Sequence, residues 1–514
     1  MKTFYQAASD KRKGKVYLVG AGPGRPDLIT VRGAEVLKSA DCIICDKLVN
    51  PALLNFARSD AEIINVPKRI GSGSFTQEEI NKLLIEKACS GQTVARLKGG
   101  DPCIFSRGAE ECLALAEAGI DFEIVPGVTA AVAAAGYAGI FLTNREYSSQ
   151  VVFVTGREAD EKQNSNIDWD RLAGFRGTIV FYMALGNLEY ISEQLIKNGM
   201  EEDAHTAVIA DATGAGQRVV KASLGQIADR CSEEKIEPPA IVIIGSAAEG
   251  NERLNWFAKK PLFGKNIVVT RDRQGNTDFA ARIIIGGGNP IEFATIKFRP
   301  LTESSRFLQA PAKLSEYDWI IFTSANGVNI FFDVLQRLGK DARTFGSAKV
   351  AAIGSETADK LSACGIRADF VPSVFTSEEL AKQLICYANL NGKKVLLLRS
   401  ASASKELGEI LEQAKAKVDD VPVYAIEAEK SDCSSLIKRI SEGEIDWLTF
   451  ASPSSVRSFF EQIRADLINS SNVKVASIGP VTSRELENLG VRIDVQAAEH
   501  TIDGLLAAVK GECE

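Results

Sequence analysis

The sequence contains very little histidine. His205 and His500 are the only two in 514 residues, and neither is accompanied by cysteine pairs at the spacing of zinc ligands. The ten cysteines stand singly, apart from Cys42 and Cys45 in an apolar run that is typical of a buried strand. We therefore expect no metal site, and thiols kept reduced rather than a disulfide scaffold.

Long hydrophobic runs and a surplus of positive charge are also missing. No segment approaches the ~18 uninterrupted apolar residues of a membrane-spanning helix, and residues 1–15 lack the apolar core of a signal peptide. A net charge of −7 argues against nonspecific binding of nucleic acid, although local basic pockets could still hold a small polyanion. These absences predict a cytoplasmic protein with neither membrane nor nucleic acid as a partner.

The length and the alternation of strands with helices predict several α/β domains. A chain of 514 residues is too long for one core and suggests roughly three or four domains. The rhythm breaks at residues 249–263, EGNERLNWFAKKPLF, where charge and a proline interrupt the pattern. We predict a first half over 14–250, a linker over 251–263 and a second half over 264–514.

The densest group of permissive and charged residues in the first half is RLKGGDPCIFSRGAEE at 96–111. It follows a short strand at 93–95 and leads into a helical pattern that runs through Ala109. Gly99 and Gly100 allow a ligand to approach the backbone closely, and Asp101 can accept hydrogen bonds. Positive charge is expected around this loop, from Arg96, Lys98 and Arg107. Alone, the stretch would be an ordinary charged turn.

Three other loops of the first half follow predicted strands. GAGPG at 20–24 resembles a nucleotide loop, but Arg25 occupies the position of the third glycine of a dinucleotide fingerprint. Asp46 ends the strand 41–45, where open α/β sheets place ligands, and is a candidate base. Lys68 and Arg69 follow the strand 63–66 and could meet carboxylates. Taken singly, these residues would be a turn aspartate and two surface charges.

A second α/β unit is predicted from strands at 151–154, 178–182, 207–210 and 240–244. It meets the first unit around residues 126–143, where a helix rich in alanine starts at Thr129 and Ala130. The density of small residues there permits close packing against a ligand or another helix.

The order of these motifs resembles uroporphyrinogen-III C-methyltransferase over roughly residues 14–250. The motifs are GAGPG, Asp46 before KLV, KR at 68–69, QEEIN at 77–81, RLKGGDP, VPGVTAA, LT at 142–143, FYM at 181–183, and Thr213 with QR at 217–218. Arg25 stands where the family usually has aspartate. Phe141 and Asn144 replace its proline and histidine, and Ala184 replaces a glycine after FYM.

The resemblance implies a two-domain tetrapyrrole methylase (class III methyltransferase) fold, with subdomains of about 14–127 and 128–250. It also implies a homodimer that uses S-adenosylmethionine, with S-adenosylhomocysteine as product, to methylate uroporphyrinogen III twice and give precorrin-2. Asp46 and Lys68 match the family's proton-transfer pair. The implied cofactor-binding residues are Pro23, Gly99, Gly100, Asp101, Ile104, Thr129, Ala130, Met183 and Ala212. The cations expected near the octacarboxylate substrate are Lys68, Arg69, Arg107 and Arg145.

The second half contains an internal repeat. DWIIFTS at 318–324 matches DWLTFAS at 446–452, and IG with Thr357 matches IG with Thr482 further on. A separation of this size corresponds to whole α/β domains. Strand ends of each repeat offer hydroxyls and backbone N–H groups to carboxylates, with one pocket between the repeats. Capping of helices is the alternative for Ser324, Ser452, Thr357 and Thr482, and we expect it in either case.

Residues 262–514 resemble uroporphyrinogen-III synthase, through VVTR, FTSANGV, VLLLR at 395–399, VPVY at 421–424 and the two IG segments. The resemblance implies a two-domain α/β fold, with one subdomain over 264–298 plus 425–514 and the other over 300–422. It implies cyclisation of hydroxymethylbilane with inversion of ring D and loss of water, helped by Tyr424. The expected substrate-binding residues are Arg271, Thr323, Ser324, Thr357, Arg399, Ser452 and Thr482.

The sequence thus predicts a bifunctional enzyme of siroheme or cobalamin synthesis, whose second half makes uroporphyrinogen III and whose first half methylates it. One alternative is an active methyltransferase fused to an inactive tetrapyrrole-binding regulatory module. Another is a tetrapyrrole carrier or sensor without turnover, against which the retained Asp46 and Lys68 argue.

Overall fold

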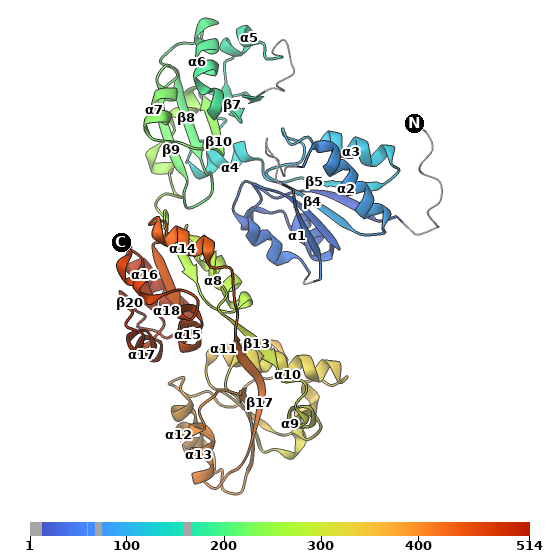
Figure 1. Cartoon of the computed structure of the whole chain (residues 1–514), viewed down its shortest axis with the longest axis vertical. Helices are drawn as coiled ribbons and strands as arrows, with labels where there is room; N and C mark the ends of the chain where they lie inside the picture. The colour runs from blue at the N-terminus through green and yellow to red at the C-terminus, as the bar shows by residue number, and fades with distance from the viewer. Residues whose placement is uncertain (1–12, 59, 67–74, 158–165, 514) are drawn as a thin grey trace.

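Four five-stranded sheets, each flanked by helices, make up the described part of the chain, and they form four lobes in Figure 1. The structure is a computed structural model that describes residues 13–58, 60–66, 75–157 and 166–513. Within these residues every helix is too short or too polar to traverse a lipid bilayer. The four sheets and their flanking helices confirm the α/β class that the sequence predicts.

The first sheet is entirely parallel and has the strand order β3-β2-β4-β1-β5. The Thr30 hydroxyl caps the first helix, α1 (Val31–Ser39), by accepting a hydrogen bond from the Gly33 N–H. Its strands are β1 (Lys15–Gly20), β2 (Cys42–Asp46), β3 (Glu62–Val66), β4 (Val94–Lys98) and β5 (Asp121–Val125). Its helices are α1 (Val31–Ser39), α2 (Gln77–Cys89) and α3 (Gly108–Glu117), and α4 (Ala130–Tyr137) leads on to the second sheet.

The second sheet is mixed, with the order β6-β7-β10-β8-β9; only β6 and β7 run parallel. The strands are β6 (Val151–Thr155), β7 (Thr178–Tyr182), β8 (His205–Ala210), β9 (Arg218–Ser223) and β10 (Ala240–Ile244), and the helices are α5 (Trp169–Ala173), α6 (Leu188–Lys197) and α7 (Ile227–Glu233). The sequence prediction missed β9. This strand forms the edge of the sheet and is largely solvated, so it has no apolar run to mark it.

The third sheet is parallel, and the chain enters it twice. Its order is β12-β11-β18-β19-β20, from β11 (Asn266–Val269), β12 (Asn289–Glu292), β18 (Trp447–Phe450), β19 (Lys474–Ser477) and β20 (Val495–Gln496). Its helices are α8 (Arg273–Ile285), α14 (Ser434–Ser441), α15 (Pro453–Phe460), α16 (Ala465–Ser470), α17 (Pro480–Asn488) and α18 (Ile502–Gly511). The strands nearest in sequence to the linker thus pair with strands from the end of the chain.

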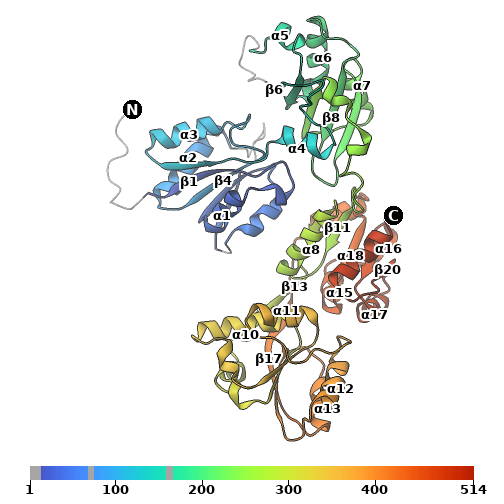
Figure 2. The same cartoon turned by 180° about the vertical axis from the view of Figure 1, so that it is seen from behind.

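The fourth sheet, β13-β17-β16-β14-β15, lies between these two passages. It contains β13 (Ile296–Pro300), β14 (Trp319–Phe322), β15 (Lys349–Ala352), β16 (Lys394–Ser400) and β17 (Lys417–Ala428), with α9 (Ser305–Gln309), α10 (Ala325–Arg337), α11 (Ser355–Ala363), α12 (Ser377–Tyr387) and α13 (Glu406–Gln413). The antiparallel pair β13 and β17 lies where the chain passes between the two lower lobes, and Figure 2 shows the same from behind.

The repeat seen in the sequence appears as matching strand-to-helix units, β14 with α10 and β18 with α15. Ser324 and Ser452 are the N-caps of these helices and accept hydrogen bonds from the Gly327 and Ser455 N–H groups, as expected. The capping expected of Thr357 and Thr482 is wrong. Gly354 and Gly479 are the N-caps there, and each threonine is buried in the first turn of its helix.

Residues 251–263 pack closely against the first half. Trp256 Nε1 donates a hydrogen bond to the Gly136 carbonyl oxygen at 3.0 Å, and the Tyr137 ring lies 4.8 Å from that of Phe257. Phe257 is only 1% exposed, and Leu262 is fully buried on the other side, in the apolar cluster of the third sheet. Because these apolar side chains are removed from water, the segment is held in place by the hydrophobic effect rather than acting as a free tether.

A buried network of charges lies beneath the carboxyl edge of the first sheet. Arg96 and Lys98 are fully buried in β4, and Glu111 of α3 accepts from Arg96 Nε at 3.2 Å and from Lys98 Nζ at 2.9 Å. Arg96 also reaches Asp46 at 2.5 Å, and Gln77 donates to Glu111. The expectation that Arg96 and Lys98 charge the loop surface is therefore wrong: β4 runs on to Lys98, and both cations point into the protein.

The network predicts that Glu111→Ala destabilises the first lobe by about 3–5 kcal/mol, because it leaves two buried cations without their shared carboxylate. Calorimetric unfolding should show this lobe melting earlier. Glu110→Ala, on the same helix, is the control, since the Glu110 carboxylate pairs with Arg107 at the surface, where such pairs contribute about 0–1 kcal/mol. Equal effects of the two substitutions would contradict the assignment.

Candidate functional site

Glycine-containing loops from three parallel strands of the first sheet converge at its carboxyl edge. Gly22 and Gly100 exchange backbone hydrogen bonds of 3.2 and 2.8 Å, which joins the loops after β1 and β4. A Cβ on Gly20 would lie 2.5 Å from the Cα of Gly127, which follows β5. Gly100 has a φ of 68°, a conformation that favours glycine. Side chains are excluded where Gly20 and Gly127 cross, while Gly99 and Gly100 remain partly exposed at the edge.

Asp101 fixes the arrangement of these loops. Its Oδ1 accepts from the Cys103 N–H at 2.7 Å, and its Oδ2 accepts from the Gly127 N–H at 2.8 Å. The carboxylate therefore ties the loop after β4 to the loop after β5. Each oxygen keeps a further lone pair for a hydroxyl or amino group of a ligand.

The start of α4 is anchored by Tyr182 at the end of β7. Its hydroxyl lies 2.7 Å from Thr129 Oγ1 and accepts from the Ala131 N–H at 3.2 Å. Burial raises the pKa of the Tyr182 phenol, so it stays protonated at neutral pH. The rings of Phe105 and Phe153 pack on it at 5.1 and 5.7 Å. The sequence points to Tyr182 only as part of the motif FYM and predicts no role for its side chain.

Left-handed backbone at residues other than glycine is concentrated around the same edge. Phe105, Arg107, Met183, Asp211 and Thr213 have φ values of 46°, 60°, 55°, 45° and 69°. Such conformations are uncommon outside glycine and cluster at functional sites, where the surroundings hold them in place. Met183 is also 51% exposed, so its thioether is accessible to a ligand.

The second sheet contributes the remaining side of the site. A Cβ on Gly24 would lie 3.4 Å from the Ala212 carbonyl oxygen and 3.2 Å from Thr213 Oγ1. Ile104, Ala130 and Ala212 pack on one apolar cluster built by α4 and the second sheet. These contacts and the glycine crossings bring together the segments that hold the expected cofactor-binding residues. Those residues are Pro23, Gly99, Gly100, Asp101, Ile104, Thr129, Ala130, Met183 and Ala212.

The structure describes only some of the first-half residues that we expect to act in catalysis or to bind substrate. Asp46 ends β2 with its side chain 21% exposed and one oxygen held by Arg96. Lys68 and Arg69 lie outside the described residues. Arg107 pairs with Glu110 at 2.5 Å on the surface, and Arg145 is exposed.

In the second half, Tyr424 of β17 and Ser324 at the start of α10 lie together within the fourth-sheet unit. The Tyr424 hydroxyl is 3.0 Å from Ser324 Oγ, and its ring meets Phe298 edge-on at 5.3 Å. Tyr424 is only 5% exposed, and this burial raises the pKa of its phenol. The phenol is therefore protonated at neutral pH and can donate a proton or a hydrogen bond.

The residues of the second half that we expect to bind carboxylates differ in burial and in hydrogen-bond partners. Arg399 is buried, and its guanidinium bonds to Asp420 and to the Ser404 carbonyl oxygen, which argues against a direct role with substrate. Arg271 follows β11, and its backbone N–H donates to Asn276. No contact among the described residues joins the Tyr424 side chain to Thr323, Thr357, Ser452 or Thr482.

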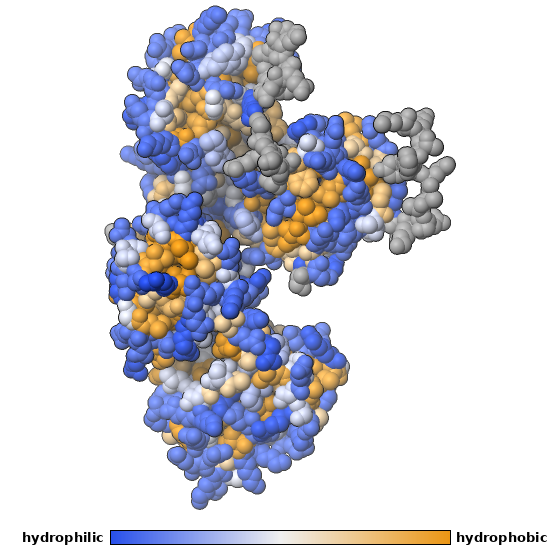
Figure 3. All heavy atoms as spheres, in the orientation of Figure 1, coloured by the Kyte–Doolittle hydropathy of each residue, from blue (hydrophilic) through white to orange (hydrophobic). Residues whose placement is uncertain are grey.

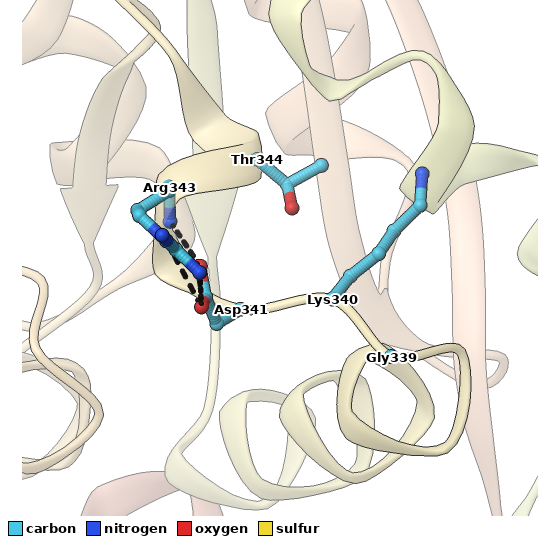
Figure 4. A pocket seen from close by; sticks show the side chains of 5 residues that line it. All are labelled: Gly339, Lys340, Asp341, Arg343 and Thr344. Atoms are coloured by element: carbon cyan, nitrogen blue, oxygen red, sulfur yellow. Dashed lines mark hydrogen bonds and ion pairs between the residues drawn. The ribbon is translucent and has the colours of Figure 1, made fainter.

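Two cavities of the second half can be compared with the positions of these residues. One of about 340 Å³ is lined by residues of α8, β13 and the hinge beyond β17, including Arg273, Lys297 and Glu429. Figure 4 shows the other, of about 300 Å³, where Asp341 bonds to Arg343 beside Lys340. This second cavity follows the C-terminal end of α10, whereas Ser324 caps the opposite end of that helix. It lies away from the carboxyl edge of the sheet, and we do not assign it to the site.

Comparisons with known proteins match both halves of the chain. The family model described as Tetrapyrrole (Corrin/Porphyrin) Methylases matches residues 15–228, and that described as Uroporphyrinogen-III synthase HemD matches residues 277–507. The chain is 37% identical over 493 residues to the porphyrin biosynthesis protein HemD of Ruminiclostridium josui, covering 96% of this chain and 97% of that protein. It is 50% identical over 232 residues to a uroporphyrinogen-III C-methyltransferase of Priestia megaterium, covering 45% of this chain and 97% of that protein.

One solved structure that is similar to the first half is the native form of uroporphyrin III C-methyl transferase from Thermus thermophilus. It is 34% identical in sequence and covers 46% of this chain and 99% of that one, with a TM-score of 0.40.

We predict that Tyr182→Phe weakens the binding of S-adenosylhomocysteine about ten-fold. Loss of the hydroxyl leaves the Ala131 N–H and the Thr129 hydroxyl without their partner at the start of α4, a cost of about 1–3 kcal/mol. Titration calorimetry measures the effect. Tyr190→Phe is the matched control, because Tyr190 is 51% exposed on α6 and should leave the affinity unchanged. Unchanged binding in both variants would refute the anchoring role of Tyr182.

Proposed function

The chain belongs to the family that joins a uroporphyrinogen-III C-methyltransferase to a uroporphyrinogen-III synthase, and we propose that both of its halves are active. The second half cyclises hydroxymethylbilane to uroporphyrinogen III with inversion of ring D and loss of water. The first half transfers two methyl groups from S-adenosylmethionine to that product and gives precorrin-2. This reaction sequence leads toward siroheme or cobalamin.

The observation that carries the proposal is the presence of both family matches, in order, on one chain that aligns almost end to end with a single relative. The converging loops of the first half and the Tyr424–Ser324 pair of the second half provide each with a chemically suitable site. The two activities also share one compound, since the product of the synthase is the substrate of the methyltransferase.

The converging loops fit S-adenosylmethionine. Gly99 and Gly100 are partly exposed beside the Asp101 carboxylate, while Ile104, Ala130, Ala212 and the exposed Met183 offer apolar surface. The bound cofactor would supply an electrophilic methyl group on a sulfonium. We assign the nine residues from Pro23 to Ala212 named above to holding it, so the chain's task is alignment of the two reactants.

We assign proton transfer in the first half to Asp46 and Lys68. A substrate that takes a methyl group from a sulfonium must lose a proton elsewhere to balance its charge, and a carboxylate at the carboxyl edge of the sheet can accept it. Arg96 holds one Asp46 oxygen at 2.5 Å, while the side chain remains 21% exposed toward the site. The carboxylates of the substrate are assigned to Arg69, Arg107 and Arg145.

In the second half we assign to Tyr424 the role of assisting departure of the substrate hydroxyl. Its protonated phenol is supported by burial and oriented by Ser324 at 3.0 Å. Pre-folding of the flexible substrate is the larger task, because orientation lowers the barrier more than one acid does. The carboxylates are assigned to Arg271 and to the helix starts near Thr323, Ser324, Thr357, Ser452 and Thr482.

We also propose the domain boundaries of the chain and the cellular location of the protein. We propose a methyltransferase over 14–250, a connecting segment over 251–263 and a synthase over 264–514, whose subdomains meet at β13 and β17. All ten cysteines are free, which supports a place in the reducing cytoplasm.

The test supplies the purified chain with hydroxymethylbilane and S-adenosylmethionine together, and identifies the products by mass and isomer analysis. We expect dimethylated tetrapyrrole of the type III series, because each half completes its own step. Only type I material would mean that the second half does not invert the ring, and the alternative of an inactive tetrapyrrole-binding module would take its place. Unmethylated type III product would contradict the methyltransferase assignment.

Single substitutions in the same assay separate the halves. Asp46→Asn should slow methylation about a hundred-fold and leave cyclisation unchanged, because one proton acceptor is lost. Tyr424→Phe should slow formation of the type III isomer about ten-fold while added uroporphyrinogen III is still methylated at the parent rate. An effect of either variant on the opposite half would contradict the separation of the sites.

We further propose that the protein is a homodimer through the methyltransferase half. Figure 3 shows hydrophobic side chains reaching the surface on the lobe built by β1–β5. Between the first two sheets, Val132, Phe141 and Tyr147 are 53%, 62% and 49% exposed. This apolar surface would be covered in a dimer.

Light scattering after gel filtration should therefore give about twice the chain mass of 55.4 kDa. Phe141→Glu should shift the mass toward the monomer, because a charge would have to be buried. Val481→Glu, which places a charge on the exposed start of α17, is the control and should stay dimeric. A parent chain that elutes as a monomer would refute the proposal.

A further inference from the structure

Arg25 follows the GAGPG loop and is buried, although it is a charged residue. Its side chain is 9% exposed and donates two hydrogen bonds to the Asp27 carboxylate, of 2.9 Å from Nε and 2.5 Å from Nη2. Burial disfavours its charge, but the hydrogen bond and the charge of Asp27 outweigh this, and the pKa of Arg25 is raised. Arg25 is therefore a permanent cation at this position.

The remaining donors of Arg25 point out of the first half. Nη1 donates to the Ile284 carbonyl oxygen at 2.9 Å, in the last turn of α8, which belongs to the third sheet. The carbonyls of a last helical turn lack partners within the helix and carry partial negative charge, so a cation is favourable there. Lys260 of the connecting segment donates to the neighbouring Ile285 carbonyl oxygen at 2.8 Å. Two cations thus cap this end of α8.

Aromatic rings hold the Arg25 guanidinium in place. It lies 5.8 Å from the ring centroids of both Tyr137 on α4 and Phe257 in the connecting segment. Cation–π contacts of this kind gain strength when they are removed from water. The Phe257 ring in turn meets Phe263 at 5.3 Å. Arg25 therefore touches the first sheet's loop, α4, the connecting segment and α8.

The loop that carries Arg25 belongs to the proposed cofactor site. The Arg25 backbone N–H donates to Thr213 Oγ1 at 3.2 Å, and the Gly24 carbonyl oxygen accepts from Asn50 Nδ2 at 2.9 Å. Thr213 follows Ala212, and Gly24 follows Pro23, both assigned to the cofactor. A displacement of the Arg25 side chain would be passed to these residues through one peptide unit.

A second contact joins the same parts of the two halves. Asn55 Nδ2 donates to Thr277 Oγ1 of α8 and to Glu292 Oε1 of β12, both at 3.3 Å. Asn55 lies on the 3-10 turn after β2, and the N-cap of this turn, Asn50, is the residue that donates to the Gly24 carbonyl oxygen. The docking of α8 on the first lobe thus has two anchor points, and Arg25 is the one that belongs directly to the chain segment of the proposed site.

We propose that Arg25 is a positioning residue through which docked helix α8 of the synthase half holds the GAGPG loop of the methyltransferase half in the form that binds S-adenosylmethionine. The proposal rests on the cofactor site proposed above. An arginine suits this position because its guanidinium can donate both to Asp27 and to the carbonyl oxygen of Ile284 at the end of α8. The state of one half is thereby linked to the affinity of the other for its cofactor.

The test compares the full-length parent chain with Arg25→Ala. We expect the Kd for S-adenosylhomocysteine and the KM for S-adenosylmethionine to rise about five-fold or more, with kcat for methylation changed less than about two-fold. Amide hydrogen exchange should become faster in two separate segments, residues 20–30 and residues 280–288. Cyclisation of hydroxymethylbilane should stay at the parent rate.

Arg464→Ala is the matched control. Arg464 is also the N-cap of a short helix and forks onto Asp466, two residues later, at 3.0 and 2.7 Å, but its side chain is 85% exposed in the third-sheet lobe. It should leave cofactor affinity and both exchange segments unchanged. Arg25→Lys keeps the charge but cannot reach Asp27 and Ile284 together, so it should fall between parent and Arg25→Ala; it also serves as the test variant if Arg25→Ala does not fold.

Two results would overturn the proposal. Weaker cofactor binding with unchanged exchange at 280–288 would mean that Arg25 acts only within its own loop, through Asp27. Faster exchange in both segments with unchanged cofactor affinity would mean that Arg25 only clamps the halves together. A parent chain that does not bind S-adenosylhomocysteine at all would refute the proposed cofactor site itself, which is a separate result from either of these.

Discussion

The buried charges of β4 are the constraint on which the first half depends. Arg96 and Lys98 share the carboxylate of Glu111 in a region without solvent, and Arg96 extends the network to Asp46. Charges removed from water are stable only when paired and hydrogen-bonded, so β2, β4 and α3 must keep their relative positions. The loop Gly99–Asp101 follows directly from this fixed strand, and a site built on it inherits its rigidity.

Rigid strands also explain how the site can use unusual backbone. Met183 and Thr213 have left-handed conformations that cost free energy, and they persist because Tyr182 and the loop of Gly24 hold the adjacent segments. Binding residues on such loops are oriented before a ligand arrives. Less ordering is then required on binding, which favours affinity and alignment of the reacting groups.

The second half uses a different means of bringing residues together. Two similar α/β units are linked by β13 and β17, and Tyr424 lies on the second of these strands beside Ser324 of the repeat. Tyr424 thus lies on a strand that links the two units, while its contacts with Ser324 and Phe298 lie within the fourth-sheet unit. The connecting segment, by contrast, is packed through Phe257 and Leu262, which makes the junction between the halves a structured contact.

The sequence by itself determined the α/β class, the two halves, the repeat and the motif order, because these depend on local periodicity and on residue types at short spacing. Ser324 and Ser452 cap their helices as predicted, since a cap requires only neighbouring residues. Tertiary structure alone decided that Arg96 and Lys98 are buried, that Arg399 is occupied by Asp420, and that Arg25 reaches Ile284. Each of these outcomes depends on a partner supplied by another element. A charged side chain points to its partner only after the fold has brought the two together.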